Sequence, residues 1–172
     1  MNRPDKLNGW TKGMMAATFE ALQKAEADDA TKVAVLTGTG KYYCAGVDLG
    51  GTVGLAMPKS VYEMIRSSNQ QLFEAFINFK KPMIVAPNGP AIGASVTSGT
   101  LADAIIASDR ATFSTPFSRL GVPPEGCSSI FFDRIMDQES AQRMLGPEGW
   151  APTAAEAKEA GFVHDVVPHE EH

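Results

Sequence analysis

Glu125 is the side chain in this sequence that best suits proton transfer. It lies in the string Pro123-Pro124-Glu125-Gly126, a stiff turn that leads into residues 128–136, which read as an apolar helix. In an apolar pocket we expect the pKa of this carboxyl to rise toward neutrality, which suits a group that takes up and returns a proton. A glutamate in a Pro-Gly loop is also often solvated or helix-capping, so this position alone does not identify an active site.

Histidine offers no other base for the middle of the chain. The three histidines, His164, His169 and His172, all lie in the final segment. A Ser-His-Asp hydrolase therefore has no support. The two cysteines, Cys44 and Cys127, have no metal-ligand spacing, and we expect neither a disulfide nor a bound metal.

Two runs of small residues each follow a β-branched, apolar segment. Residues 33–36 precede Tyr43-Cys44-Ala45-Gly46-Val47-Asp48-Leu49, and residues 83–86 precede Asn88-Gly89-Pro90-Ala91-Ile92-Gly93-Ala94-Ser95. Each run reads as a strand end that turns into a loop or helix start, where a ligand oxygen can approach the backbone. Two such loops can aim two N–H groups at one point, as an oxyanion hole requires. Taken singly, either loop is also explained by glycine and alanine permitting a tight turn.

Helices and strands are expected to alternate along the chain. The predicted helices are 11–27, 60–79, 93–101 and 128–136, and the predicted buried strands are 32–37, 83–86 and 104–108, with a short extended piece at 111–113. Thr153 to Glu156 form a capping box, and Gly161 ends that helix before a strand at 162–167. This order favours an α/β fold with parallel strands covered by helices.

Composition indicates one soluble globular domain over residues 1–172. Hydrophobic residues make up 44% and charged residues 20% of the chain, and the formal net charge is −5. A nucleic-acid partner is not expected, because phosphate contacts need a concentrated basic surface. No stretch approaches the roughly 18 apolar residues of a membrane span, so no membrane partner is expected.

The sequence resembles the crotonase, or enoyl-CoA hydratase/isomerase, superfamily over almost its whole length. The resemblance rests on Asn2-Arg3-Pro4, on the two small-residue loops, on Lys81-Pro82, on residues 107–113 and on the ending from 153 to 167. The strings Thr115-Pro116-Phe117-Ser118-Arg119-Leu120-Gly121 and Pro124-Glu125-Gly126-Cys127-Ser128-Ser129 are most similar to delta-3,delta-2-enoyl-CoA isomerases of the peroxisomal type. The resemblance implies the ββα spiral fold of crotonase and ClpP.

The resemblance also implies a role for individual residues. The backbone N–H groups of Val47 and Ala94 would form the oxyanion hole, aided by the dipole of the helix that starts near Gly93, and Glu125 would be the catalytic base. Substrate and coenzyme A contacts are expected at Ala45, Gly46, Val47, Asp48, Leu49 and Gly93, and the acyl pocket at Met64 and Phe117. No cofactor is expected beyond the coenzyme A of the substrate, and no metal.

Two substitutions relative to hydratases favour isomerase chemistry. Enoyl-CoA hydratases have two glutamates, at the positions held here by Thr97 and Phe117. One glutamate suffices to move a double bond, so the expected reaction is conversion of 3-enoyl-CoA to trans-2-enoyl-CoA in fatty-acid β-oxidation. The alternatives are a noncatalytic crotonase-like module that binds coenzyme A or a protein, and another crotonase activity such as thioester hydrolysis.

Family resemblance sets the remaining expectations. The N-terminal hairpin and the C-terminal trimerisation helices of the family are not found, which leaves the expected homotrimer open. The expected compartment is intracellular, peroxisomal or mitochondrial, without a targeting signal in this sequence. Asp48 is expected to hold its loop, Asp109-Arg110 to form a turn and a local ion pair, and residues 50–54 to be flexible.

Overall fold

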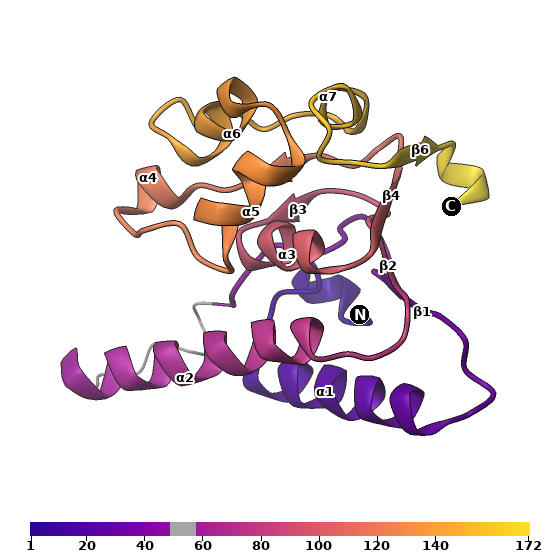
Figure 1. Ribbon diagram of the computed structural model, residues 1–172. Helices are drawn as coiled ribbons and strands as arrows, with labels where there is room; N and C mark the ends of the chain where they lie inside the picture. Colours follow the sequence, from indigo (N-terminus) through magenta and orange to yellow (C-terminus); the bar gives the residue numbers. More distant parts are fainter. Residues whose placement is uncertain (49–57) are drawn as a thin grey trace.

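A parallel β-sheet forms the centre of the molecule (Figure 1). The computed structural model describes residues 1–48 and 58–172, apart from the side chains of residues 58–62, 64–66, 68 and 69. Within these residues the sheet has the order β1-β2-β4-β6, with all pairs parallel; the strands are Ala34–Thr37 (β1), Met83–Ala86 (β2), Ala104–Ser108 (β4) and Asp165–Val167 (β6). A second, two-stranded parallel sheet pairs Ala91–Ile92 (β3) with Phe113–Ser114 (β5). The α/β class with parallel strands is confirmed.

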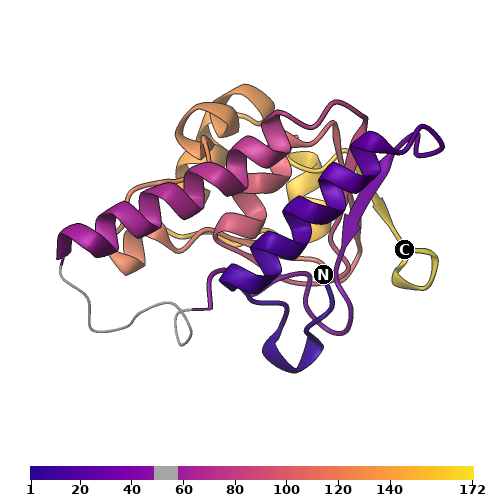
Figure 2. The same ribbon diagram turned by 90° about the horizontal axis from the view of Figure 1, so that it is seen from below.

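Two long helices lie side by side along one side of the sheet (Figures 1 and 2). They are Lys12–Ala27 (α1) and Pro58–Ile77 (α2). Thr11 caps α1, because its side chain accepts the N–H of Met14 at 3.2 Å. Met14 and Met15 are buried, whereas Phe19 and Leu22 pack against the core from partly exposed positions.

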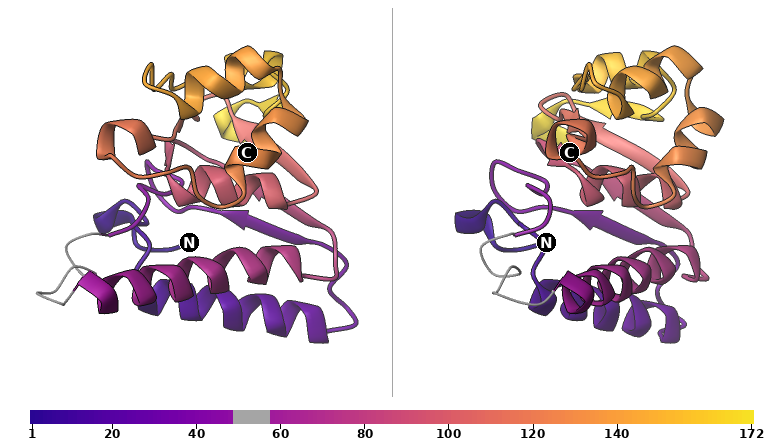
Figure 3. Two further views of the ribbon diagram at one scale, coloured as in Figure 1. Left: turned by 60° about the vertical axis from the view of Figure 1, so that its left-hand side comes forward. Right: turned by 90° about the vertical axis from the view of Figure 1, so that its left-hand side faces the viewer.

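Short helices cover the opposite side of the molecule, as both views of Figure 3 show. They are Phe117–Leu120 (α4), Ser128–Ile135 (α5), Gln138–Leu145 (α6) and Ala154–Glu159 (α7). Edge-to-face contacts join β5, α5 and the segment after α7, since the Phe162 ring lies 5.1 Å from that of Phe113 and 5.5 Å from that of Phe132. Three-residue 3₁₀ turns occur near both ends, at Pro4–Lys6 and His169–Glu171.

Several predicted elements need correction. The strand predicted at 32–37 is shorter and is not buried: Val33 is 45% and Val35 59% exposed, because β1 is the edge strand of the four-stranded sheet. The helix predicted at 93–101 divides into Ala94–Thr97 (α3) and a 3₁₀ turn at Ser98–Leu101. Residues 162–164 do not belong to the last strand.

The turn predicted at Asp109-Arg110 is confirmed, whereas the local ion pair predicted there is wrong. Arg110 instead contacts Glu170 at 3.3 Å, after the chain has returned through β6. The flexible segment predicted at residues 50–54 lies outside the described residues. In the part of the chain that the structure describes, no helix is long and apolar enough to cross a membrane.

Candidate active site

Asn88 joins the second small-residue loop to the segment that precedes the first. Its Oδ1 accepts the N–H of Gly38 at 3.0 Å, and its Nδ2 donates to the carbonyl of Gly40 at 2.7 Å. The next residue, Gly89, packs directly on the Lys41 carbonyl and leaves no room for a Cβ. The loop therefore needs both the amide of Asn88 and the missing side chain of Gly89.

The two loops then pair through their backbones. Cys44 and Ala91 form a parallel bridge, in which the Cys44 N–H donates to the Pro90 carbonyl at 3.3 Å and the Ile92 N–H donates to the Cys44 carbonyl at 3.0 Å. Gly46 approaches the same strand so closely that a Cβ would stand 3.0 Å from the Ile92 carbonyl oxygen, and its φ is +84°. Both the close approach and the positive φ require glycine at this position.

Trp10 sets the direction of the Val47 N–H. The Trp10 N–H donates to the Gly46 carbonyl at 2.8 Å, and the Asp48 N–H donates to the Trp10 carbonyl at 2.9 Å. Neighbouring residues of an extended segment direct their N–H groups to opposite sides, so the Val47 N–H faces away from Trp10. No acceptor for it occurs among the described residues.

The N–H of Ala94 is also unused. Gly93 turns the chain with φ +63° and gives its own N–H to the Ser114 carbonyl at 2.8 Å. The Gly93 carbonyl then accepts from Val96 and Thr97, at 2.9 and 3.2 Å, and within the described residues the Ala94 N–H has no acceptor. The helix that follows has only four residues, so the dipole expected to assist this N–H is small.

Glu125 directly precedes Gly126, the residue that packs against Thr97 of α3. It is half-buried, and a Cβ on the next residue, Gly126, would stand 2.5 Å from Thr97 Oγ1 and 2.5 Å from the ring of Phe73. Thr97 lies one helical turn after Ala94 and donates to its carbonyl at 3.4 Å. The turn that contains Glu125 thus packs directly against α3, the helix that begins with Ala94.

The other predicted site residues are placed less completely. Phe117 is buried in α4, with 4% of its surface exposed. Asp48 lies 3.8 Å from Arg3 in an ion pair. Met64 belongs to α2 but its side chain is outside the described set, and Leu49 lies outside the described residues altogether.

Cys44, in the first small-residue loop, is a buried thiol. Cys44 and Cys127 are both free, and burial raises the pKa of the Cys44 thiol to about 11, so this thiol stays protonated at neutral pH. Among the described residues, no three histidine, cysteine or acidic side chains are grouped so that they could hold a metal ion.

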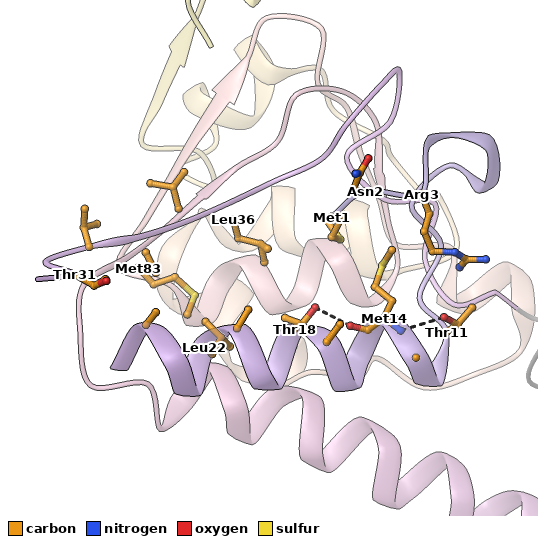
Figure 4. A pocket seen from close by; sticks show the side chains of 17 residues that line it. Met1, Asn2, Arg3, Thr11, Met14, Thr18, Leu22, Thr31, Leu36 and Met83 are labelled. Atoms are coloured by element: carbon orange, nitrogen blue, oxygen red, sulfur yellow. Dashed lines mark hydrogen bonds between the residues drawn. The ribbon is translucent and has the colours of Figure 1, made fainter. Parts of the chain in front are cut away.

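A large cavity lies elsewhere in the molecule. It has a volume of about 770 Å³ and is lined by α1, β1 and the first residues of the chain; Met14, Leu22, Leu36 and Met83 contribute apolar surface (Figure 4). None of Val47, Ala94 and Glu125 lines it. This cavity therefore does not locate the candidate site, which is defined by backbone groups and one carboxylate.

Comparison with known proteins gives the class. The family model described as enoyl-CoA hydratase/isomerase matches residues 1–172. An enoyl-CoA hydratase/isomerase from Pseudoalteromonas atlantica has the same fold, with a TM-score of 0.85 and 30% identity over 99% of this chain and 65% of that chain. The chain belongs to the enoyl-CoA hydratase/isomerase family and has the crotonase fold.

Within this family, the chain is similar to enoyl-CoA delta isomerases and to chromodomain Y-like proteins. Human enoyl-CoA delta isomerase 2 is 45% identical over 97% of this chain and 42% of the relative, and mouse peroxisomal enoyl-CoA delta isomerase 3 is 41% identical over 97% and 52%. A mouse chromodomain Y-like protein is 35% identical over 92% of this chain and 27% of the relative. The chain thus spans about half the length, or less, of these relatives.

Proposed function

We propose that this chain carries the reaction centre of an enoyl-CoA isomerase that converts 3-enoyl-CoA to trans-2-enoyl-CoA. The observation that carries the proposal is the pair of N–H groups, on Val47 and Ala94, that have no acceptor within the described residues and lie in two loops bonded to each other. A thioester oxygen that receives two such hydrogen bonds is stabilised most when it bears the negative charge of an enolate. The similarity to enoyl-CoA delta isomerases supports the same reaction.

Glu125 is the proton carrier in this proposal. Its carboxylate removes a proton from C2 of the 3-enoyl thioester, and the electron pair of the C–H bond delocalises into a dienolate whose oxygen is held by Val47 and Ala94. The protonated Glu125 then returns the proton at C4, which moves the double bond to C2. The substrate keeps all its atoms, and neither water nor a redox cofactor takes part.

The residues around Glu125 favour isomerisation over hydration. Thr97 is fully buried and donates to the Ala94 carbonyl, and Phe117 is apolar and buried, so neither supplies the carboxylate that would activate a water molecule. Phe117 and Met64 are proposed to line the acyl pocket. Residues 45–49 and Gly93 are proposed to contact coenzyme A.

Relatives also suggest the cellular setting. We assign the reaction to fatty-acid β-oxidation, in a peroxisome or mitochondrion, in line with the peroxisomal isomerase among the relatives. A homotrimer is proposed by resemblance to the family. Coenzyme A enters as part of the substrate, and no separate cofactor is required.

A noncatalytic binding module is the second candidate. The similarity to chromodomain Y-like proteins favours it, because these relatives match over 92% of this chain and their name states no enzymatic activity. The two candidates differ in what Glu125 does: an isomerase requires its carboxylate, whereas a module that binds an acyl-CoA thioester requires only the two loops.

The test is conversion of 3-hexenoyl-CoA to 2-hexenoyl-CoA, resolved by chromatography. We compare the wild type with Glu125→Gln, which preserves the shape of the side chain, and with Glu139→Gln, which changes an exposed glutamate of α6. We expect Glu125→Gln to lower kcat by a factor of at least ~100 and Glu139→Gln to leave it unchanged. Circular dichroism confirms that each variant is folded.

Other outcomes would replace the proposal. Equal background rates in all three proteins, with hexanoyl-CoA still bound, would support the noncatalytic module. Release of free coenzyme A that depends on Glu125 would indicate a thioester hydrolase built on the same oxyanion hole.

A further inference from the structure

Ser95 connects the two loops at the point where their N–H groups are presented. It is buried, with 2% of its surface exposed, and it directly follows Ala94. Its Oγ lies 3.2 Å from the carbonyl oxygen of Cys44, a residue 51 positions earlier and three residues before Val47. The Ser95 hydroxyl thus links the residue next to Ala94 to the loop that carries Val47.

The hydroxyl takes part in a closed set of hydrogen bonds. Ser95 Oγ accepts the N–H of Ile92 at 3.0 Å, and it is also 3.0 Å from the Ile92 carbonyl oxygen. Since a hydroxyl has a single proton, it donates to either the Cys44 or the Ile92 carbonyl at any moment. The Ile92 N–H is itself shared, because it also donates to Cys44 at 3.0 Å.

The backbone bridge between Cys44 and Ala91 already holds the loops together, and Ser95 adds a side-chain hydrogen bond beside it. Gly46 and Gly93 flank the two N–H groups, and both have positive φ, at +84° and +63°. Glycine permits these turns but does not select one spacing over another. Ser95 supplies a directional bond across the gap, and its burial strengthens that bond by excluding water.

We propose that Ser95 is a positioning residue, which sets the distance between the Val47 and Ala94 N–H groups so that both reach one thioester oxygen. The inference rests on the proposed function, because it assumes that these two groups bind that oxygen. Ser95 does not touch the substrate in this proposal. It acts through the Cys44 carbonyl on one side and through the backbone of Ala94 on the other.

The chain offers a matched control. Ser98 is a second buried serine in the same segment, with 1% of its surface exposed, and its hydroxyl has no hydrogen-bond partner among the described residues. Ser95→Ala and Ser98→Ala remove the same atom from neighbouring buried sites. Ser95→Thr retains the hydroxyl and serves as the conservative rescue.

Two measurements separate positioning from general packing. The first is kcat and KM for 3-hexenoyl-CoA. The second is the ratio of the Kd of S-hexyl-CoA, which has a methylene in place of the thioester carbonyl, to the Kd of hexanoyl-CoA. Partial unfolding weakens the binding of both ligands alike and leaves the Kd ratio unchanged. Only a change at the site that binds the thioester carbonyl alters this ratio.

We expect Ser95→Ala to lower kcat by about 10- to 100-fold, with KM changed less than about 3-fold, because full loss of one oxyanion donor costs about 100- to 1000-fold. The Kd ratio should fall toward one. Ser98→Ala should preserve both values, and Ser95→Thr should restore most of kcat. Unchanged kcat and ratio in Ser95→Ala, or equal losses in the two alanine variants, would overturn the inference.

The same data test the proposed function separately. A wild-type protein that lacks isomerase activity but prefers hexanoyl-CoA to S-hexyl-CoA would refute the isomerase, while Ser95 is still judged by the Kd ratio. A wild-type protein that binds the two ligands equally has no oxyanion hole, and both proposals would then be wrong.

Discussion

Trp10 and Val47 pair through their backbones as residues of adjacent parallel strands do. The contact brings the beginning of the chain against the first small-residue loop and turns the Val47 N–H away from it. The indole is fully buried, yet its Nε1 has no hydrogen-bond partner in the described part of the chain. The Trp10 side chain therefore contributes to packing in the core, while the Trp10 backbone orients the first small-residue loop.

This division predicts the effect of changing Trp10. Trp10→Phe should lower the free energy of unfolding by about 1–2 kcal/mol, because it loses buried volume but no hydrogen bond. Trp10→Ala should cost about 3–5 kcal/mol, since it leaves a large cavity. Urea unfolding followed by circular dichroism measures both. A loss well above about 2 kcal/mol for Trp10→Phe would mean that the indole N–H makes a bond, for example to a buried water.

Asn88→Ala should destabilise the site more than its small volume suggests. The variant leaves the Gly38 N–H and the Gly40 carbonyl without the partners that they have in the wild type. Each such orphaned group costs about 1–3 kcal/mol when it stays buried. We expect a loss of about 2–4 kcal/mol in urea unfolding.

An exposed asparagine provides the control for this prediction. Asn78→Ala, at the end of α2, should stay within about 0.5 kcal/mol of the wild type. A loss of the same size in Asn78→Ala and Asn88→Ala would show that the two bonds of Asn88 contribute nothing to holding the loops together.

Elements with strong local signals are predicted well from the sequence. The strands β2 and β4 have the predicted bounds, since each is a short apolar run between breakers. The capping box at Thr153 is confirmed, and Gly161 follows α7 with φ +87°. Exposure of β1 is not predictable in the same way, because it depends on which strand ends at the edge of the sheet.

The site is predicted only in part, for a related physical reason. Small residues in a loop indicate that a backbone can be approached, so the two loops are found from sequence. The groups that hold them are not: Trp10 and Ser95 act across long stretches of chain on the backbone of other residues, which leaves no periodic signal. The roles of Val47, Ala94 and Glu125 stay predictions.

Acid should weaken the start of α7 through Glu156. The N–H and the hydroxyl of Thr153 both donate to its carboxylate, at 2.8 and 2.7 Å, and they lower the pKa of Glu156 from its ordinary value of 4.5. A carboxyl with a lowered pKa stabilises the fold above its ordinary value, and this contribution is lost as pH falls through the lowered value.

Glu156→Gln removes this titration and keeps an acceptor for the cap. The variant should be less stable than the wild type at pH 7, and the difference should shrink as pH falls below 4.5. Thermal unfolding between pH 3 and pH 7, at roughly constant ionic strength, measures it. Glu159→Gln, in the same helix, is the control, and a pH-independent difference for Glu156→Gln would contradict the prediction.

Gly126 determines how closely the Glu125 turn can approach α3, and Gly121 provides a matched comparison. Both have positive φ, at +62° and +67°, but a Cβ at Gly126 would overlap Thr97 and Phe73, whereas a Cβ at Gly121 would meet nothing within 4 Å. Alanine therefore introduces the same backbone strain at both positions, about 1–2 kcal/mol. Only Gly126→Ala adds the steric overlap, for about 1–3 kcal/mol more.

The two alanine variants should differ more in activity than in stability. Gly126→Ala is expected to push the Glu125 turn away from the helix that carries Ala94, and thereby to lower kcat for 3-hexenoyl-CoA by about 10-fold or more, since small misplacement of a catalytic group is costly. Gly121→Ala should keep kcat within about 2-fold of the wild type, since it adds strain and no overlap. If both variants keep full kcat, the contact between Gly126 and Thr97 does not position the base, because the turn can then move outward without affecting proton transfer.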